Sequence, residues 1–292
     1  SLKRLRIDNI ESSVFSEYLK QLHEQIRYNE LNGSIVITDE NIYHLVDVWY
    51  LIHHVKIFIR EDIQIQCPIS IPPIETWDVS NVTNMKELFK RKYKFNSNIG
   101  NWNVSNVTDM SGMFDHASSF DQPIEGWDVS NVTDMSGMFD HASSFNQPIE
   151  GWDVSNVTDM FGMFDHAYSF NQPIGSWDVS NVTDMSGMFD HAYSFDQPIE
   201  GWDVSNVTDM SEMFDHAYSF NQPIGSWDVS NVTDMSEMFK YASSFNQKIG
   251  GWNISSIKTV SCMALPAVPE KCDTFFSPPS KKRRCAGCHA DN

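Results

Sequence analysis

The chain lacks the features that mark membrane proteins and disulfide-rich secreted proteins. Its 292 residues contain no run of 18 apolar residues, so we expect no membrane span. The charged start SLKRLRIDNIESS has no apolar segment, so we expect no intact signal peptide. The five cysteines form an odd set without a framework spacing, which argues against a disulfide scaffold and is compatible with a reducing compartment. They are Cys67, Cys262, Cys272, Cys285 and Cys288.

Basic residues are missing from one long stretch in the middle of the chain. No Lys or Arg occurs between Asn101 and Phe239, and the formal net charge is -19. Affinity for nucleic-acid backbones comes from Lys and Arg, so we predict that this region does not bind nucleic acid. Its acidity would steer a basic protein partner, although a solubilising surface explains the same composition.

What the chain does have is a 25-residue unit, such as WDVSNVTDMSGMFDHASSFNQPIEG from Trp127 to Gly151, which recurs before and after that stretch. One unit holds too few apolar residues to close a core but enough to bury against an identical neighbour, so we predict that the units stack. Tryptophan marks the period at Trp77, Trp102, Trp127, Trp152, Trp177, Trp202, Trp227 and Trp252.

Each unit is predicted to be one coil of an α/β repeat. A short strand is expected over Asn131 to Met135, where β-branched residues lie among polar ones and neighbouring copies can pair in parallel. Ser136 is expected to cap a short helix, because the following apolar residues fall on one helical face, and Pro148 would end it. For the repeated Asn-Val-Thr, as at Asn131, we favour a hydrogen-bonded ladder between coils over glycosylation.

The unit W-D-V-S-N-V-T-D-M-S-x-M-F-x-x-A-x-x-F-N-Q-P-I resembles the BspA-like, or Mycoplasma-lipoprotein-associated, surface-protein repeat, a leucine-rich-like repeat, from about Ile74 to Ile257. The resemblance implies a right-handed leucine-rich-like solenoid used for adhesion or protein binding in bacterial surface proteins, protists and some large DNA viruses. It implies no enzyme. Bacterial members usually carry an export signal or lipid anchor, which is not seen here.

We divide the chain into four parts: a small α/β head or N-terminal cap over 1–65, a lead-in over 66–76, the solenoid over 77–263, and a disordered, basic, cysteine-containing tail over 264–292. The head is predicted to contain helices over 10–28 and 39–53 and strands over 34–38 and 55–59. Residues 28–52 also resemble the later part of a BTB/POZ domain. That likeness would imply an adaptor whose head dimerises or contacts a ubiquitin-ligase scaffold while the repeats hold a client.

The candidate binding residues come from two columns of the repeat and one exception. Of the six near-identical coils, three adjacent ones carry tyrosine where the other three carry serine, and these rings should stand about 5 Å apart. One coil carries Phe161 where the other five have serine, and a histidine recurs at a position expected to point outward. We predict that this surface binds a protein partner. The candidate residues are Phe161, Tyr168, Tyr193, Tyr218, His141, His166, His191 and His216.

Metals and cofactors are not predicted. Stacked histidines could bind a transition metal or sense pH, and the Asp column that includes Asp134 invites calcium, but copied surface residues explain both columns. The sequence Cys285-Ala286-Gly287-Cys288-His289 matches the C-x-x-C-H haem pattern, yet only three residues follow it, so we predict no haem.

The repeats also argue against catalysis, because an active site needs one asymmetric constellation, whereas these Ser, Asp and His residues are copied in every coil. We therefore predict a non-enzymatic protein-binding or structural solenoid. The alternatives are the BTB-like adaptor and a cell-surface or virion-surface adhesion protein. The sequence leaves the compartment and the oligomeric state open, and we favour an intracellular location, host cytoplasm or nucleus, over the surface.

Overall fold

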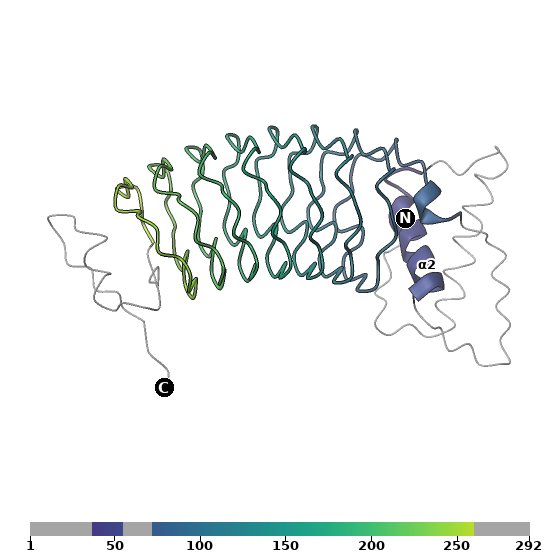
Figure 1. Cartoon of the computed structure of the whole chain (residues 1–292). Coiled ribbons are helices and arrows are strands. Elements are labelled where there is room, and N and C mark those ends of the chain that lie inside the picture. The colour runs from purple at the N-terminus through teal and green to yellow at the C-terminus, as the bar shows by residue number, and fades with distance from the viewer. Residues whose placement is uncertain (1–36, 55–71, 260–292) are drawn as a thin grey trace.

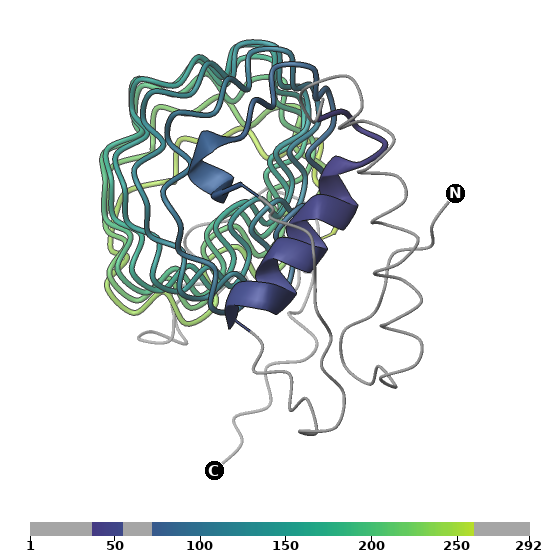
Figure 2. The ribbon, with the colours of Figure 1, turned by 90° about the vertical axis from the view of Figure 1, so that its right-hand side faces the viewer.

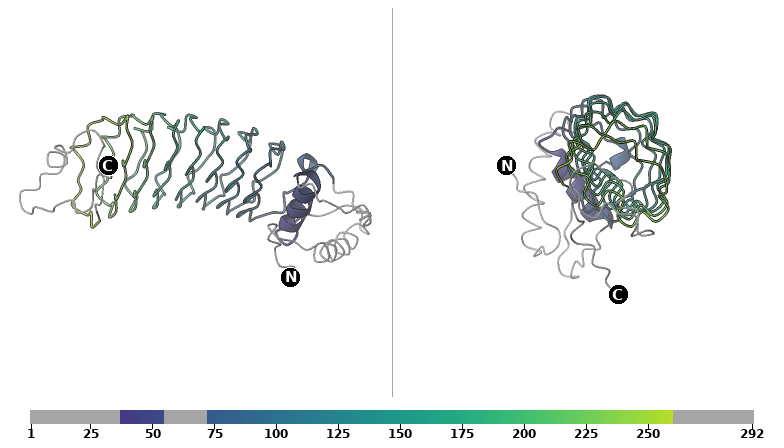
Figure 3. Two further views of the ribbon diagram at one scale, coloured as in Figure 1. Left: turned by 90° about the horizontal axis from the view of Figure 1, so that it is seen from below. Right: turned by 90° about the vertical axis from the view of Figure 1, so that its left-hand side faces the viewer.

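The computed structural model of the chain describes residues 37–54 and 72–259. Residues 77–259, which we call the coil stack, form similar coils that lie side by side along a gently curved rod (Figure 1; Figure 3). The described residues before it form the α-helix α2 over Ile42–His54 and the 3-10 helix η2 over Ile74–Thr76. Seen along the rod, successive coils superpose closely (Figure 2), as expected when each coil repeats the same residues at the same positions.

The core is a set of continuous columns that run from coil to coil. The stacked Phe139 and Phe164 rings have centroids 5.6 Å apart, and those of Trp127 and Trp152 are 6.5 Å apart. Within a coil, Phe139 and Phe145 stack at 4.0 Å. All nine apolar positions of the 127–151 unit are buried, as predicted: Trp127, Val129, Val132, Met135, Met138, Phe139, Ala142, Phe145 and Ile149.

The predicted strand and helix of each unit are not found in the described coils. In place of a strand, each coil contributes one residue, such as Asp134, to an isolated parallel bridge with the next. In place of a helix, the backbone turns through two residues in the left-handed region, Gly137 (φ 57°) and His141 (φ 54°). A right-handed helix cannot pass through such residues, so the chain forms consecutive turns instead.

Backbone hydrogen bonds in these turns alternate between two directions. Gly137 N–H donates to the Phe161 carbonyl of the next coil at 2.7 Å, and His141 N–H donates to the Asp165 carbonyl at 2.8 Å. Phe139 N–H likewise donates to the next coil, whereas the N–H groups of Met138 and Asp140 donate to carbonyls three residues back in the same coil. Alternate peptide groups therefore join each coil to the next, as in a parallel ladder, and the units are not separate beads.

Side chains form further hydrogen bonds between neighbouring coils. Asn131 Nδ2–H donates to the Ser105 carbonyl of the previous coil at 2.8 Å, and the same bond recurs along the rod, so the predicted asparagine ladder is confirmed. At another corner, the Asp121 carboxylate accepts from the backbone N–H of Asn146 at 3.0 Å, and Asn146 repeats the contact with Asn171. Only an acceptor oxygen is needed there, which explains why both Asp and Asn occur at this position.

Helix α2 covers the first coil (Figure 2). Its Trp49 packs edge-on against Phe95 at 5.9 Å, and its Asp47 forms a buried 2.6 Å ion pair with Lys92. Asp39, which precedes this helix, accepts hydrogen bonds from the backbone N–H groups of Thr83 and Asn84. Helix and first coil are thus joined by polar as well as apolar contacts.

Several predicted segments cannot be compared with the structure. The helix predicted over 10–28, the strand over 55–59, the end of the solenoid over 260–263 and the tail lie outside the described residues. Of the strand predicted over 34–38, only Ile37 and Thr38 are described, and neither lies in a strand. Ile37 is buried next to α2, where it joins the hydrophobic core.

Candidate binding surface

Three tyrosines form a stacked aromatic surface, which we call the tyrosine strip: Tyr168, Tyr193 and Tyr218. Successive ring centroids are 4.7 and 4.9 Å apart, in agreement with the spacing predicted from the repeat. The outer two side chains are exposed, and Tyr193 is half-buried between them. The strip exists because three neighbouring coils carry tyrosine at one repeat position and the coils are held in register by their hydrogen bonds.

Two other exposed aromatic residues stand apart from this strip. Tyr93 occupies the same repeat position in the first coil and is 50% exposed, but Ser118 and Ser143 separate it from Tyr168. Phe161 is 54% exposed, and no ring contact joins it to another aromatic side chain in the described part of the chain. The structure therefore brings the three predicted tyrosines together and leaves Phe161 isolated.

The predicted histidines form a second stack beside the strip, the histidine column of His116, His141, His166, His191 and His216. Neighbouring imidazole centroids are 4.1 to 4.2 Å apart. The column also contacts the strip, with 5.7 Å between the His166 and Tyr168 ring centroids. Tyr241 extends it at 4.5 Å from His216, an aromatic contact that the repeat position of Tyr241 could have revealed.

Each histidine is paired with the aspartate that precedes it. Nδ1 of His141 and of His166 lies 2.5 Å from the neighbouring carboxylate, Asp140 or Asp165, and His116 makes the same contact with Asp115. An ionised carboxylate accepts only, so Nδ1 carries the proton in that state and Nε2 is left as an acceptor. The paired carboxylates form a second row, the aspartate row of Asp115, Asp140, Asp165, Asp190 and Asp215.

In the described part of the chain, lysines form ion pairs with this row at its two ends. Lys90 lies 2.9 Å from the Asp115 carboxylate, and Lys240 lies 3.6 Å from that of Asp215. Among the described residues, no lysine or arginine forms an ion pair with the three interior members, Asp140, Asp165 and Asp190. The sequence signal for this arrangement is that lysine replaces aspartate at the flanking repeat positions, 90 and 240.

The interior of the row consequently resists ionisation. Burial, followed by the nearby Asp140 charge, raises the pKa of Asp165 to about 7. Burial and the charge of Asp165 raise the pKa of Asp190 to about 7 as well. Burial and the neighbouring imidazoles lower the pKa of His166 to about 4. Neither member of the Asp165–His166 pair readily carries charge in this setting.

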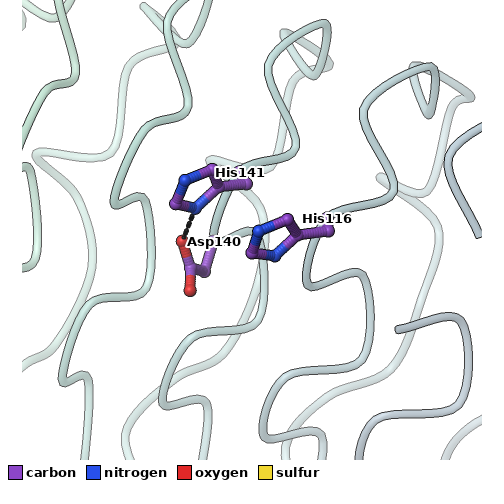
Figure 4. Close-up of side chains that lie close together, drawn as sticks. All are labelled: His116, Asp140 and His141. Carbon is purple, nitrogen blue, oxygen red and sulfur yellow. Dashed lines mark hydrogen bonds and ion pairs between the residues drawn. The ribbon is translucent and has the colours of Figure 1, made fainter. Parts of the chain in front are cut away.

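Three groups in the two rows bring one carboxylate oxygen and two imidazole nitrogens within 4.8 Å of one another. Figure 4 shows one of them, with Asp140 beside the rings of His116 and His141. The Asp134 column is arranged differently: its Oδ1 accepts from Ser136 N–H at 2.9 Å and from Ser136 Oγ–H at 2.7 Å. Closing this turn gives that column a structural role.

Comparison with known protein families identifies a match. The sequence model of the family described as "Mycoplasma protein of unknown function, DUF285" matches residues 63–177 and 162–268. No curated protein and no solved structure shows significant similarity to the chain. In the described residues, no helix has the length and apolar character required to cross a bilayer.

Proposed function

The chain belongs to the DUF285 repeat family of Mycoplasma proteins of unknown function, and we propose that it is a non-enzymatic, leucine-rich-like solenoid that binds a protein partner through its tyrosine strip. The observation that carries the proposal is the stacking of Tyr168, Tyr193 and Tyr218 across three consecutive coils. The rest of the repeat unit stays nearly constant there, so the tyrosines distinguish these coils from their neighbours.

Tyrosine suits such a role for physical reasons. Its ring offers a large contact area with few rotatable bonds, and interfaces are enriched in tyrosine. Ring stacking at 4.7 and 4.9 Å restricts these side chains further, which lowers the entropy lost on binding. The neighbouring histidine column widens the aromatic surface, and the three tyrosine hydroxyls offer polar contacts.

The negative charge of the coils around the tyrosine strip favours a basic partner. The strip lies in the stretch from Asn101 to Phe239, which has no Lys or Arg. A complementary basic surface would be attracted over a distance of about 8 Å at physiological ionic strength and would associate faster than a neutral one. Lys or Arg side chains of the partner could also lie over the exposed tyrosine faces.

The adaptor and adhesion hypotheses have less structural support. The adaptor hypothesis concerns the head, and the described part of that head, α2, packs on the first coil and has the position of a cap. The adhesion hypothesis follows from the resemblance to surface-protein repeats and places the same binding surface outside a cell or virion. Both would use the coil stack to hold a protein.

The test compares the wild-type chain with a variant carrying Tyr168→Ser, Tyr193→Ser and Tyr218→Ser, since serine is the natural residue at this position in other coils. A partner captured by the wild type is purified, and its dissociation constant is measured for both chains. We expect the triple variant to bind at least about tenfold more weakly, the loss of one or two interface anchors.

The matched control is Tyr93→Ser, which changes an exposed tyrosine at the same repeat position outside the strip. This control should bind like the wild type. Equal affinity of the triple variant and the wild type would show that the partner does not use the strip.

A further inference from the structure

The histidine column and the aspartate row contain donor sets suited to a transition metal. Each of the three groups supplies one carboxylate oxygen and two imidazole nitrogens within 4.8 Å. The groups are Asp140 with His116 and His141, Asp165 with His166 and His191, and Asp190 with His191 and His216. Imidazole and carboxylate together are ligands typical of zinc, and three protein ligands leave a fourth position for water.

The donor atoms of each group need to move only a short distance toward one another to bind zinc. Zinc binds nitrogen and oxygen donors at about 2.0 to 2.2 Å, which places tetrahedral donors about 3.3 to 3.5 Å apart. Donors within 4.8 Å must therefore approach by at most about 1.5 Å. The histidine side chains retain 22 to 38% of their exposure, so the rings can rotate and the ion can enter from solvent.

An independent observation concerns charge. The carboxylates in the three groups are Asp140, Asp165 and Asp190, the interior members of the aspartate row. These three have no ion pair with lysine or arginine in the described structure, whereas the end members, Asp115 and Asp215, pair with Lys90 and Lys240. A divalent cation bound at the interior would supply the positive charge that lysine supplies at the ends.

We propose that the histidine column binds Zn²⁺ or a similar transition-metal ion, with at most two ions per chain. One ion binds Asp140, His116 and His141. The second binds one of the other two groups, because both require His191 and a neutral imidazole has only one nitrogen lone pair to donate to a metal ion. This proposal does not depend on the tyrosine strip or on its protein partner.

The test counts bound Zn²⁺ by calorimetric titration of the full chain without an affinity tag, with all five cysteines changed to serine so that they cannot bind the ion. Each histidine is replaced by Asn, which tolerates the left-handed backbone at these positions. We expect two ions in the parent chain, one in His141→Asn and one in His191→Asn. We expect two in His166→Asn, because Asp190, His191 and His216 remain.

His53→Asn, an exposed histidine of α2 outside the column, is the matched control and should leave both ions in place. If the cysteine-free chain does not fold, Co²⁺ absorption of the native chain replaces the titration. Column binding then gives ligand-field bands that His141→Asn and His191→Asn weaken, without the thiolate charge-transfer band of a cysteine site. The triple tyrosine variant should still bind both ions, which separates this proposal from the proposed function.

Three results would overturn the proposal: a zinc count unchanged by His141→Asn and His191→Asn together, a count halved by His53→Asn, or binding of Ca²⁺ or Mg²⁺ as tight as that of Zn²⁺. The last would indicate a diffuse acidic surface, because imidazole contributes little to the binding of those two ions.

Discussion

Removal of one phenylalanine ring from the middle of the rod should cost more stability than removal of the equivalent ring at its end. Phe164 is fully buried and stacks on Phe139 at 5.6 Å and on Phe189 at 5.7 Å. Phe239, the last phenylalanine of this column, stacks on Phe214 at 5.7 Å and has no phenylalanine one period later in the sequence. Both rings also contact a phenylalanine of their own coil, Phe170 or Phe245.

The expected magnitudes follow from these contacts. Replacement of a buried phenylalanine by alanine costs about 3 to 5 kcal/mol, and a stacked aromatic pair contributes about 0.5 to 1.5 kcal/mol beyond its buried area. Phe164→Ala loses two column partners and Phe239→Ala loses one, so Phe164→Ala should be the more destabilising by about 1 kcal/mol. Urea unfolding, followed by both tryptophan fluorescence and circular dichroism, measures the difference. Equal losses, or a greater loss at Phe239, would contradict the view that each coil is stabilised from both sides.

Two further predictions concern the backbone and pH. Gly187→Ala should destabilise the chain by about 1 kcal/mol because its φ of 60° is costly for alanine, whereas Gly201→Ala, without that constraint, should be close to neutral in the same unfolding assay. The pKa values of Asp165 and Asp190, raised from 3.8 to about 7, give stability that is complete below pH 3.8 and lost as pH rises through 7. The pKa of His166, lowered from 6.5 to about 4, acts oppositely between those two values and offsets about half of this effect, so the free energy of unfolding should fall steadily from about pH 4 to 7 and level off above pH 7. Replacing both aspartates by asparagine should flatten this fall in melting temperature, and an unchanged profile would refute the assignment.

The sequence predicted the period, the buried positions and the tyrosine spacing, because all three follow from identical units in register. A column such as that of Phe164 needs no knowledge of the backbone path between its members. The asparagine ladder could be predicted for the same reason, since one polar side chain recurs at one coil corner.

The local backbone could not be predicted in this way. The apolar pattern after Ser136 fits one face of a helix, but Gly137 and His141 both adopt positive φ and break it. Glycine is a known signal of that conformation, and histidine is a weak one. The inter-coil hydrogen bonds that hold His141 in this conformation link residues 24 positions apart, beyond the reach of local propensity.

The sequence identified the residues of the candidate surface but not the arrangement of their side chains. The histidine and aspartate columns were evident, whereas the groups that combine residues of two coils depend on side-chain orientation. Phe161 was grouped with the tyrosines because phenylalanine is unusual at its repeat position. In the structure its ring does not contact the tyrosine strip. Lys90 and Lys240 are apparent in the sequence as replacements of aspartate. Their ion pairs with the two ends of the aspartate row became apparent only from the structure.

The central claim is that the 25-residue units are interchangeable in the stack and that three particular units carry the binding surface. Removal of whole coils tests this claim most directly. One chain lacks residues 127–151 and another lacks 177–201, which contains Tyr193. Both should stay folded, since the flanking columns rejoin in register. The first should bind the partner like the wild type, and the second, with two tyrosines left, should bind more weakly. Unfolding of either chain, or equal affinity of the two, would contradict the account.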